Sequence, residues 1–303
     1  MKKNKERWII KAGSSLVAGQ NEGLNKSFIT RLVAESIELL KEVEIIIVSS
    51  GAIAKGISEL NLIQRPSSLD LLQASAAVGQ MGLINSYQNE FKKYNVKTAQ
   101  VLISHDDIAN RQRYLNSRRS LQTLLKLGVV PIVNENDSVA TEEITFGDND
   151  MLAGALVGVV NATALVMLTD QEGVYTSDPR LDRSAELIKK IDLDDTKLNL
   201  HSVMQDSSGV LGRGGMKTKI KAAKLALELG AETFIADGRK DGTLRSLLKG
   251  KKVGTSIVSK KNGLPGRKQW IASLGSPIGS LKLDKGAEEA IINEGRSLLA
   301  VGI

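Results

Sequence analysis

The chain has 303 residues, of which 42% are hydrophobic, and it carries a formal net charge of +7 with no cysteine. This length predicts about two domains, or one large α/β domain with an appendage, and the hydrophobic content excludes a globally disordered chain. The lack of cysteine excludes disulfide bonds, structural zinc and thiol nucleophiles, and a cytoplasmic protein is expected. The excess of lysine and arginine lies mainly in residues 1–7 and 249–268, where solvated surface charge is a better explanation than a nucleic-acid site.

Short apolar runs alternate along the chain with longer segments of helical periodicity. The alternation predicts an α/β fold in three layers, with a mainly parallel central sheet and helices on both of its faces. The predicted strands are 8–10, 44–48, 99–103, 129–133, 164–168 and 233–236. The predicted helices are 26–41, 70–93, 115–127, 150–160 and 216–229.

Residues 151–168 form an apolar stretch that is nearly as long as a transmembrane helix. Asn161 and Thr163 interrupt the stretch, and the acidic sequence at 148–150 before it suits the amino end of a helix. A buried helix followed by a buried strand explains this pattern, so no membrane span is expected.

Polar residues gather where four of the predicted strands end. They are Lys-Ala-Gly-Ser-Ser at 11–15, Ser-Ser-Gly-Ala at 49–52, Asn-Glu-Asn-Asp at 134–137 and Thr-Asp at 169–170. The carboxyl ends of parallel strands meet at one edge of a sheet, which is where α/β proteins bind their ligands. One such cluster could be turn chemistry, but four together favour a binding site.

The segment 211–219 reads LGRGGMKTK and precedes a predicted helix. Gly209 and Gly214 have the spacing of a Walker A loop, but Gly215 occupies the position of its lysine, so that motif is excluded. Closely spaced glycines can still bring backbone N–H groups to phosphate oxygens, and so can the small residues after Lys11. The combination of glycine, lysine and acid predicts phosphoryl transfer that depends on positioning and electrostatic stabilisation.

Histidine chemistry is not indicated by the sequence. His105 and His201 are the only histidines, and no nucleophile-elbow, HExxH or dinucleotide-binding motif accompanies them. An acid such as Asp150, placed between lysines, would hold the lysines in position. Carboxylates near phosphates also suit Mg²⁺.

Eight segments together resemble the amino acid kinase family, and within it the glutamate 5-kinases. They are IIKAGSSL at 9–16, IIIVSSGAIAKG at 45–56, AAVGQMGL at 76–83, RYLNSRRSL at 113–121, VVPIVNENDSVAT at 129–141, FGDNDMLA at 146–153, LTDQEGVYTSDPR at 168–180 and GRGGMKTKIKAA at 212–223. The match runs in order from Trp8 to Trp270. Its most specific parts are NENDSVAT, GDND and GGMKTK, which favour this branch over acetylglutamate kinases, aspartokinases and uridylate kinases.

The resemblance implies an enzyme that uses ATP to phosphorylate the side-chain carboxylate of L-glutamate, giving L-glutamyl 5-phosphate in the first step of proline biosynthesis. It implies that Lys11 and Lys219 stabilise the transferring phosphoryl group and that Asp150 orients both lysines. The implied substrate-binding residues are Ser50, Gly51, Asn134, Asp137, Asp148 and Asn149. The implied nucleotide-binding residues are Lys11, Gly13, Ser14, Thr169, Asp170, Arg213, Gly214, Gly215, Met216, Lys217, Thr218 and Lys219.

The same resemblance implies further properties of the enzyme. Mg²⁺ would bridge the ATP phosphates, proline is an expected feedback inhibitor, and a homo-oligomer is expected. In the family pattern Gly-Gly-Met-x-Thr-Lys, Lys217 takes the variable position and Lys219 the functional one.

The expected domain organisation also follows from the resemblance. Residues 1–260 form the kinase domain, 261–274 a linker, and 275–303 resemble about the first third of a PUA module, an RNA-binding type of fold that is too short here to bury its own core. An RNA-binding or regulatory protein is therefore the alternative from another class. Binding alone would not require the combination of Lys11, Asp150 and Lys219.

Overall fold

The computed structural model describes residues 5–19, 23–139, 149–193, 215–259, 270–271 and 282–292. The chain divides into two compact units, Met1–Ser273 and Leu274–Ile303. In the described part of the second unit, the helix α12 (Lys285–Ile292) has no buried residue. No helix within the described ranges is long and apolar enough to cross a membrane.

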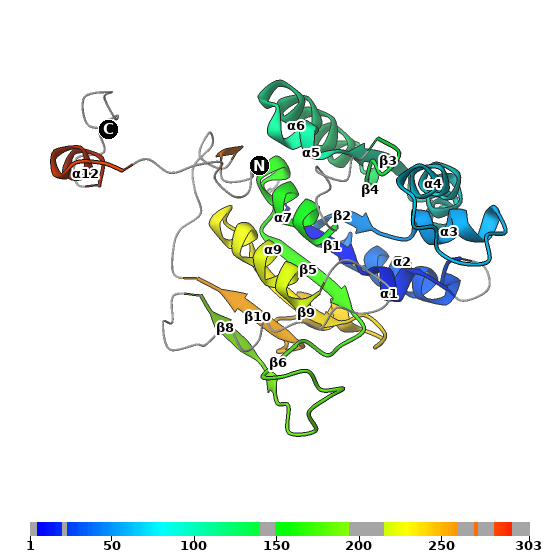
Figure 1. The fold of residues 1–303 in the computed structure, drawn as a ribbon. Helices are drawn as coiled ribbons and strands as arrows, with labels where there is room; N and C mark the ends of the chain where they lie inside the picture. The colour runs from blue at the N-terminus through cyan, green and yellow to red at the C-terminus, as the bar shows by residue number, and fades with distance from the viewer. Residues whose placement is uncertain are drawn as a thin grey trace. The chain divides into compact units, whose positions relative to one another are not determined.

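The first unit is built on an eight-stranded sheet with the order β3-β4-β2-β1-β5-β9-β10-β8 (Figure 1). Neighbouring strands from β3 to β9 run parallel, whereas β10 runs antiparallel to β9 and parallel to β8. A separate pair, β6 and β7, is antiparallel. The strands are β1 (Arg7–Ala12), β2 (Glu44–Ser49), β3 (Thr98–Ile103), β4 (Val130–Glu135), β5 (Ala164–Thr169), β6 (Val174–Tyr175), β7 (Leu187–Ile188), β8 (Lys190–Asp192), β9 (Glu232–Asp237) and β10 (Thr255–Val258).

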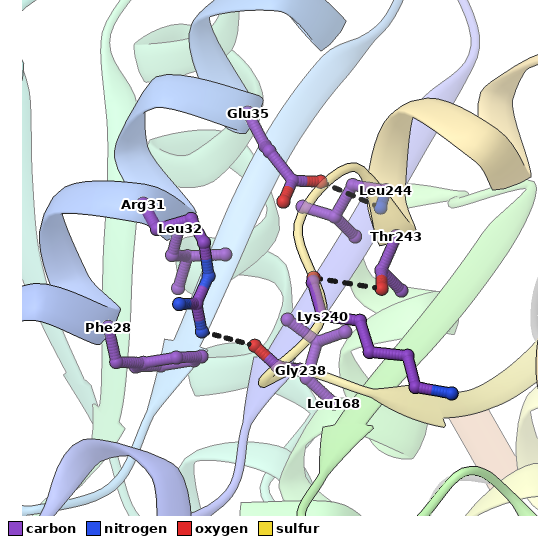
Figure 2. Close-up of a pocket in the computed structure, with 9 residues that line it drawn as sticks. All are labelled: Phe28, Arg31, Leu32, Glu35, Leu168, Gly238, Lys240, Thr243 and Leu244. Atoms are coloured by element: carbon purple, nitrogen blue, oxygen red, sulfur yellow. Dashed lines mark hydrogen bonds between the residues drawn. The ribbon is translucent and has the colours of Figure 1, made fainter.

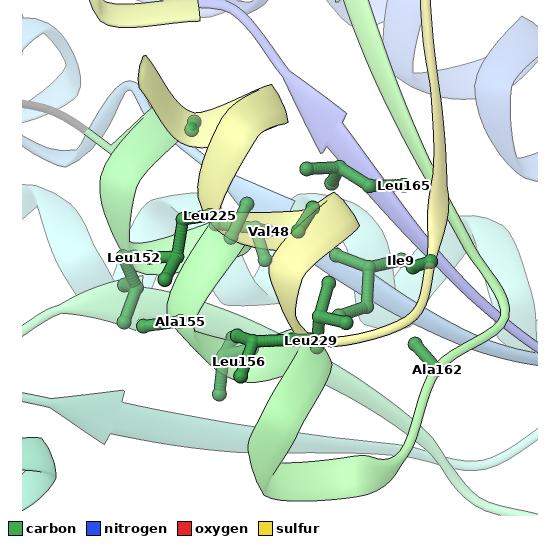
Figure 3. Close-up of a cluster of buried hydrophobic side chains, with 14 of the residues drawn as sticks. Ile9, Val48, Leu152, Ala155, Leu156, Ala162, Leu165, Leu225 and Leu229 are labelled. Carbon is green, nitrogen blue, oxygen red and sulfur yellow. The ribbon is translucent and has the colours of Figure 1, made fainter. Parts of the chain in front are cut away.

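Helices cover both faces of this sheet. They are α1 (Ser14–Val17), α2 (Lys26–Leu39), α3 (Ala52–Glu59), α4 (Leu69–Lys92), α5 (His105–Ala109), α6 (Arg111–Lys126), α7 (Asn149–Val160), α9 (Met216–Glu228) and α10 (Thr243–Leu248). One hydrophobic cluster joins β1, β2 and β5 to α6, α7 and α9 through residues such as Ile9, Val48 and Leu165, as Figure 3 shows in part. The other joins the same strands to α1, α2, α4 and α10 through residues such as Ile10 and Ile47.

Alternate residues of each central strand therefore enter opposite cores, because successive side chains of a strand point to opposite faces. The predicted three-layer α/β fold is confirmed. All six predicted strands and all five predicted helices are present, with their ends shifted by a few residues. The largest shift is at α6, which begins at Arg111 because the Asn110 side chain caps it by accepting hydrogen bonds from the backbone of Gln112 and Arg113.

The apolar stretch 151–168 consists of α7 followed by β5, and both are buried as predicted. The sequence analysis missed the shorter elements, which are α1, α3, α5, α10, α12, β6, β7, β8 and β10. Each of these spans eight residues or fewer, which is too short for a periodic pattern to develop.

Two glycines bring α3 and α4 into backbone contact. A Cβ atom on Gly56 would lie 1.7 Å from the Ser75 carbonyl oxygen, and one on Gly79 would lie 2.0 Å from the Ala52 carbonyl oxygen. Any larger residue would push the two helices apart. Since α3 follows directly after Gly51, this contact also fixes the loop at the end of β2.

Candidate active site

The centre of the site is a buried carboxylate held between two lysines. Asp150 Oδ1 lies 2.5 Å from Lys11 Nζ, and Asp150 Oδ2 accepts a hydrogen bond of 3.0 Å from Lys219 Nζ. The Asp150 side chain is fully buried, and the two lysine side chains are only 5% and 8% exposed. The structure thus brings together the three residues that the sequence analysis singled out for catalysis.

Three elements of the fold place these residues. Lys11 lies near the carboxyl end of β1, where it pairs in register with Val48 of β2 and Met167 of β5. Asp150 lies in the first turn of α7, and Lys219 lies one turn into α9. The amino ends of both helices therefore face the site, and helix amino ends attract anions.

The two lysines keep Asp150 ionised. Burial alone would raise the pKa of this carboxyl group, but the charges of Lys11 and Lys219 and their hydrogen bonds lower it to about 2. Two buried ammonium groups are thus held side by side at this carboxylate. This arrangement suits an anionic ligand such as a phosphoryl group.

A chain of side-chain amides lies beside this centre. The backbone N–H of Glu135 donates to Asn149 Oδ1 at 3.3 Å, so Asn149 Nδ2 points the other way. Asn149 Nδ2 donates to Asn134 Oδ1 and to Ser50 Oγ, both at 2.9 Å. Because a backbone N–H can only donate, it fixes the orientation of every amide along the chain.

Gln80 ends this chain and was given no role by the sequence analysis. Its Oε1 accepts a hydrogen bond of 2.8 Å from Asn134 Nδ2, and the side chain is buried. Gln80 also lines a cavity of about 390 Å³ together with Asp137. The signal in the sequence was the segment AAVGQMGL at 76–83, in which Gln80 is the one polar side chain among apolar and small residues.

Ser50 and Gly51 occupy the connection between β2 and α3. Gly51 has a positive φ of 112°, and a Cβ atom there would lie 2.8 Å from Val17 Cγ1. Only glycine fits this position without strain. The turn thereby directs Ser50 towards Asn149.

The residues expected to bind the nucleotide lie on three loops. Gly13 caps α1 and donates its N–H to the Leu168 carbonyl at 3.2 Å, and Ser14 follows it as the first residue of α1. Thr169 is buried at the end of β5, and Asp170 after it is exposed. The remaining described members, Gly215 to Lys219, form the N-cap and first turn of α9.

The two lysines of this last segment have different surroundings. Lys217 is exposed, whereas Lys219 is buried against Asp150. Thr218 Oγ1 lies 3.2 Å from Asp150 Oδ2 and 2.8 Å from the Gly215 carbonyl oxygen. Asp148, Arg213 and Gly214 fall outside the described residues.

Comparison with known proteins shows the family of the chain. The model of the amino acid kinase family matches residues 6–237. A glutamate 5-kinase of Hydrogenovibrio crunogenus is 45% identical over 298 residues, which make up 98% of this chain and 79% of that protein. A glutamate 5-kinase of Nitrosococcus oceani is 47% identical, with the same coverage.

Solved structures share the fold at low sequence identity. The UMP kinase of Ureaplasma parvum is 17% identical, with a TM-score of 0.57 over 84% of this chain and 100% of that one. An isopentenyl phosphate kinase in a substrate complex is also 17% identical, with a TM-score of 0.59 over 83% of this chain and 99% of that one. With a family match over most of the first unit and full-length relatives well above 40% identity, the chain belongs to the amino acid kinase family.

Proposed function

We propose that this protein is a glutamate 5-kinase, which transfers the γ-phosphoryl group of ATP to the side-chain carboxylate of L-glutamate. The observation that carries the proposal is the buried Asp150 carboxylate between Lys11 and Lys219, in a chain whose relatives are glutamate 5-kinases. Membership of the amino acid kinase family implies the use of ATP. The product, L-glutamyl 5-phosphate, starts the synthesis of proline.

The proposed reaction needs charge compensation and no general base. The attacking group is a carboxylate with an ordinary pKa of about 4.3, so it is already ionised at neutral pH. One of its oxygens bonds to the γ-phosphorus while the bond from that phosphorus to the bridging oxygen of ADP breaks. Both reactants are anions, and Lys11 and Lys219 offset their repulsion and the charge on the transferring group.

Asp150 acts as the positioning residue of the pair. It is fully buried and touches both ammonium groups, and their charges disfavour the uptake of a proton by this carboxylate. Because its pKa is lowered to about 2, it keeps its charge at any pH where the enzyme works. A fixed anion between the lysines prevents them from moving apart through mutual repulsion.

L-glutamate is proposed to bind beside the amide chain. Ser50, Gly51, Asn134 and Asn149 would direct the substrate towards the lysines, and Asp137 at the cavity would receive its ammonium group. Asp148 is a second proposed acidic partner. The amide chain supports this assignment because its orientation is set before any ligand enters.

ATP is proposed to lie across the amino ends of α7 and α9. Gly13, Ser14, Thr169, Asp170 and residues 213–219 would hold it, with backbone N–H groups facing the phosphates. The described residues contain no group of three or more acidic or histidine side chains that could hold a metal ion. Mg²⁺ is proposed to accompany ATP, because this ion is commonly held by substrate phosphates together with one or two carboxylates.

Acyl-phosphate formation tests the proposal directly. The purified protein is incubated with ATP, Mg²⁺ and L-glutamate, and the product is trapped with hydroxylamine. L-aspartate and N-acetyl-L-glutamate serve as parallel substrates. Hydroxamate from L-glutamate alone is expected; equal product from either of the other two, or none from any of them, would contradict the proposal.

Three further properties are proposed. A homo-oligomer is proposed from the resemblance to glutamate 5-kinases alone. Feedback inhibition by proline would match an enzyme at the start of proline synthesis. A cytoplasmic location fits an enzyme that consumes ATP and an amino acid.

A further inference from the structure

One face of α2 binds a distant turn of the chain through a buried carboxylate. Glu35 is buried, and its two oxygens accept hydrogen bonds of 2.9 Å from the backbone N–H groups of Gly242 and Leu244. These partners are 207 and 209 residues further along the chain. Figure 2 shows the bond to Leu244 and the tight course of the turn between Gly238 and Leu244.

Arg31 holds the other end of the same turn. Its Nη2 donates to the Gly238 carbonyl at 2.8 Å (Figure 2). Its Nε lies 3.2 Å from Asp241 Oδ1. Arg31 and Glu35 are four residues apart on a helix, so they face the same side. We call this pair the α2 clasp.

The α2 clasp is tightly packed around the turn. The cavity between α2 and the turn measures only about 10 Å³, which leaves space for about one water molecule. An apolar residue in place of Glu35 would leave the buried N–H of Leu244 and the part-buried N–H of Gly242 without acceptors, which is costly. The buried carboxylate therefore specifies the shape of the turn.

The 238–244 turn, which the α2 clasp holds, also contacts the loop that follows β5. The Gly238 N–H donates to the Thr169 carbonyl at 2.9 Å. The Lys240 ammonium group forms an ion pair with the Glu172 carboxylate. The pKa of Arg239 is raised by its hydrogen bond to Asp237, and also by the nearby charges of Asp170 and Glu172.

We propose that Arg31 and Glu35 are positioning residues for nucleotide binding, because they hold the 238–244 turn and, through it, the loop at 169–172. This inference rests on the proposed nucleotide role of Thr169 and Asp170. Neither clasp residue touches the substrates. Among the described residues, the turn contacts Thr169 and Glu172 after β5 and lies beside Leu16 of α1, so its effect falls on ATP and spares L-glutamate, whose proposed residues follow β2 and β4.

Steady-state kinetics of Glu35→Gln measure this effect. The variant keeps the size of the side chain but turns one acceptor into a donor that faces a backbone N–H. We expect the KM for ATP to rise about tenfold, with the KM for L-glutamate changed less than about twofold. Glu38→Gln is the matched control, because Glu38 lies on the same helix and pairs with Arg245 of α10 at the surface. It is expected to leave both constants unchanged.

Binding of a non-hydrolysable ATP analogue, measured by calorimetry, separates this inference from the proposed function. Weaker analogue binding by Glu35→Gln supports the clasp even if the wild-type protein does not phosphorylate L-glutamate. A lower melting temperature with unchanged analogue binding, or an equal rise in both KM values, would overturn it. Wild-type protein that binds no analogue would overturn it as well. If Glu35→Gln fails to fold, analogue binding is measured with Arg31→Lys instead. The Arg31 side chain is 30% exposed, so this position tolerates a change, and a lysine there cannot contact both Gly238 and Asp241.

Discussion

Asp150 carries its charge inside the protein only because Lys11 and Lys219 surround it. Its pKa is lowered from an ordinary value of about 3.9 to about 2, so the ionised form stabilises the folded state at every pH above about 4. This stabilisation is lost as the pH falls through about 2. The shift corresponds to roughly 2–3 kcal/mol.

Replacing Asp150 with Asn tests this stabilisation, because the substitution exchanges one carboxylate oxygen for an amide nitrogen. We expect urea unfolding at pH 7 to show a lower free energy of unfolding for Asp150→Asn, since two buried lysines lose their anionic partner. The difference from the wild type should shrink between pH 4 and pH 2, because the wild-type carboxyl group becomes protonated there. A difference in the free energy of unfolding that stays constant down to pH 2 would contradict the lowered pKa of Asp150.

Lys219 and Lys217 allow a paired test of the phosphoryl-transfer role. Lys219 is buried against Asp150 and Lys217 is exposed two residues earlier. We expect Lys219→Ala to lower kcat by about a thousandfold or more, and Lys217→Ala to change it by less than about threefold. An equal loss in both variants, measured by hydroxamate formation, would show that the register of the loop is wrong.

A substitution of Gln80 tests whether the amide chain contributes to the binding of L-glutamate. Gln80→Met keeps the volume of the side chain but removes the acceptor for Asn134 Nδ2. We expect the KM for L-glutamate to rise about tenfold while the KM for ATP stays the same. Gln88→Met, an exposed change on the same helix, is the control. An unchanged KM for L-glutamate would remove Gln80 from the site.

Among the elements, α3 and α4 show how packing reaches the site. Their backbones touch at Gly56 and Gly79, and α3 starts at the loop that carries Ser50. A displacement of α3 would therefore also move Ser50 away from Asn149.

Two substitutions on α4 separate this contact from helix propensity. Gly79→Ala would place a methyl group 2.0 Å from the Ala52 carbonyl, and we expect it to lower the free energy of unfolding by about 3 kcal/mol. Gly82→Ala would meet only the flexible ends of Lys55 and Glu59, and we expect a change within about 1 kcal/mol. Urea denaturation checks both, and equal effects would contradict the role of the close approach.

Whether an element could be predicted from the sequence depended on its length and its burial. Strands such as β1 and β5 were predictable because burial on both faces makes them continuous apolar runs. The gathering of Lys11, Asn134 and Thr169 followed from the parallel direction of their strands. Short elements such as α3 and β10 were not predictable, since tertiary contacts rather than periodicity decide them.

The hydrogen-bond partners of Gln80 and Glu35 could likewise not be predicted from the sequence. Gln80 meets Asn134 across 54 residues, and Glu35 meets Gly242 across 207. Neither pair has a local pattern that could reveal it. Only the packing of α4 on β4, and of α2 beside α10, brings these groups together.

At the scale of the whole molecule, we propose that the kinase reaction belongs to the first unit alone. A chain that ends at Ser273 is expected to keep kcat and both KM values within about twofold, as independent domains usually do. Loss of activity in this chain, at unchanged solubility, would contradict the proposal.

A shorter chain that ends at residue 269 is the comparison. It lacks Trp270, whose Nε1 donates to the Ile108 carbonyl at 3.0 Å and whose ring lies 5.1 Å from the Arg111 guanidinium carbon. We expect this chain to melt at a lower temperature than the one that ends at Ser273, because the Trp270 ring also packs against the hydrophobic core. Identical melting temperatures would show that Trp270 does not stabilise the first unit.

The central place of β1 in the sheet has a consequence for synthesis on the ribosome. β1 is the first strand made, yet one of its two neighbours is β5, and Arg7 donates a hydrogen bond to the Val160 carbonyl 153 residues later. At a translation rate of about 5–20 residues per second, this side of β1 stays without its partner for roughly 10–30 seconds. During that time the nascent chain exposes an apolar strand edge that includes Lys11, and chaperones that bind extended apolar segments have their best opportunity there.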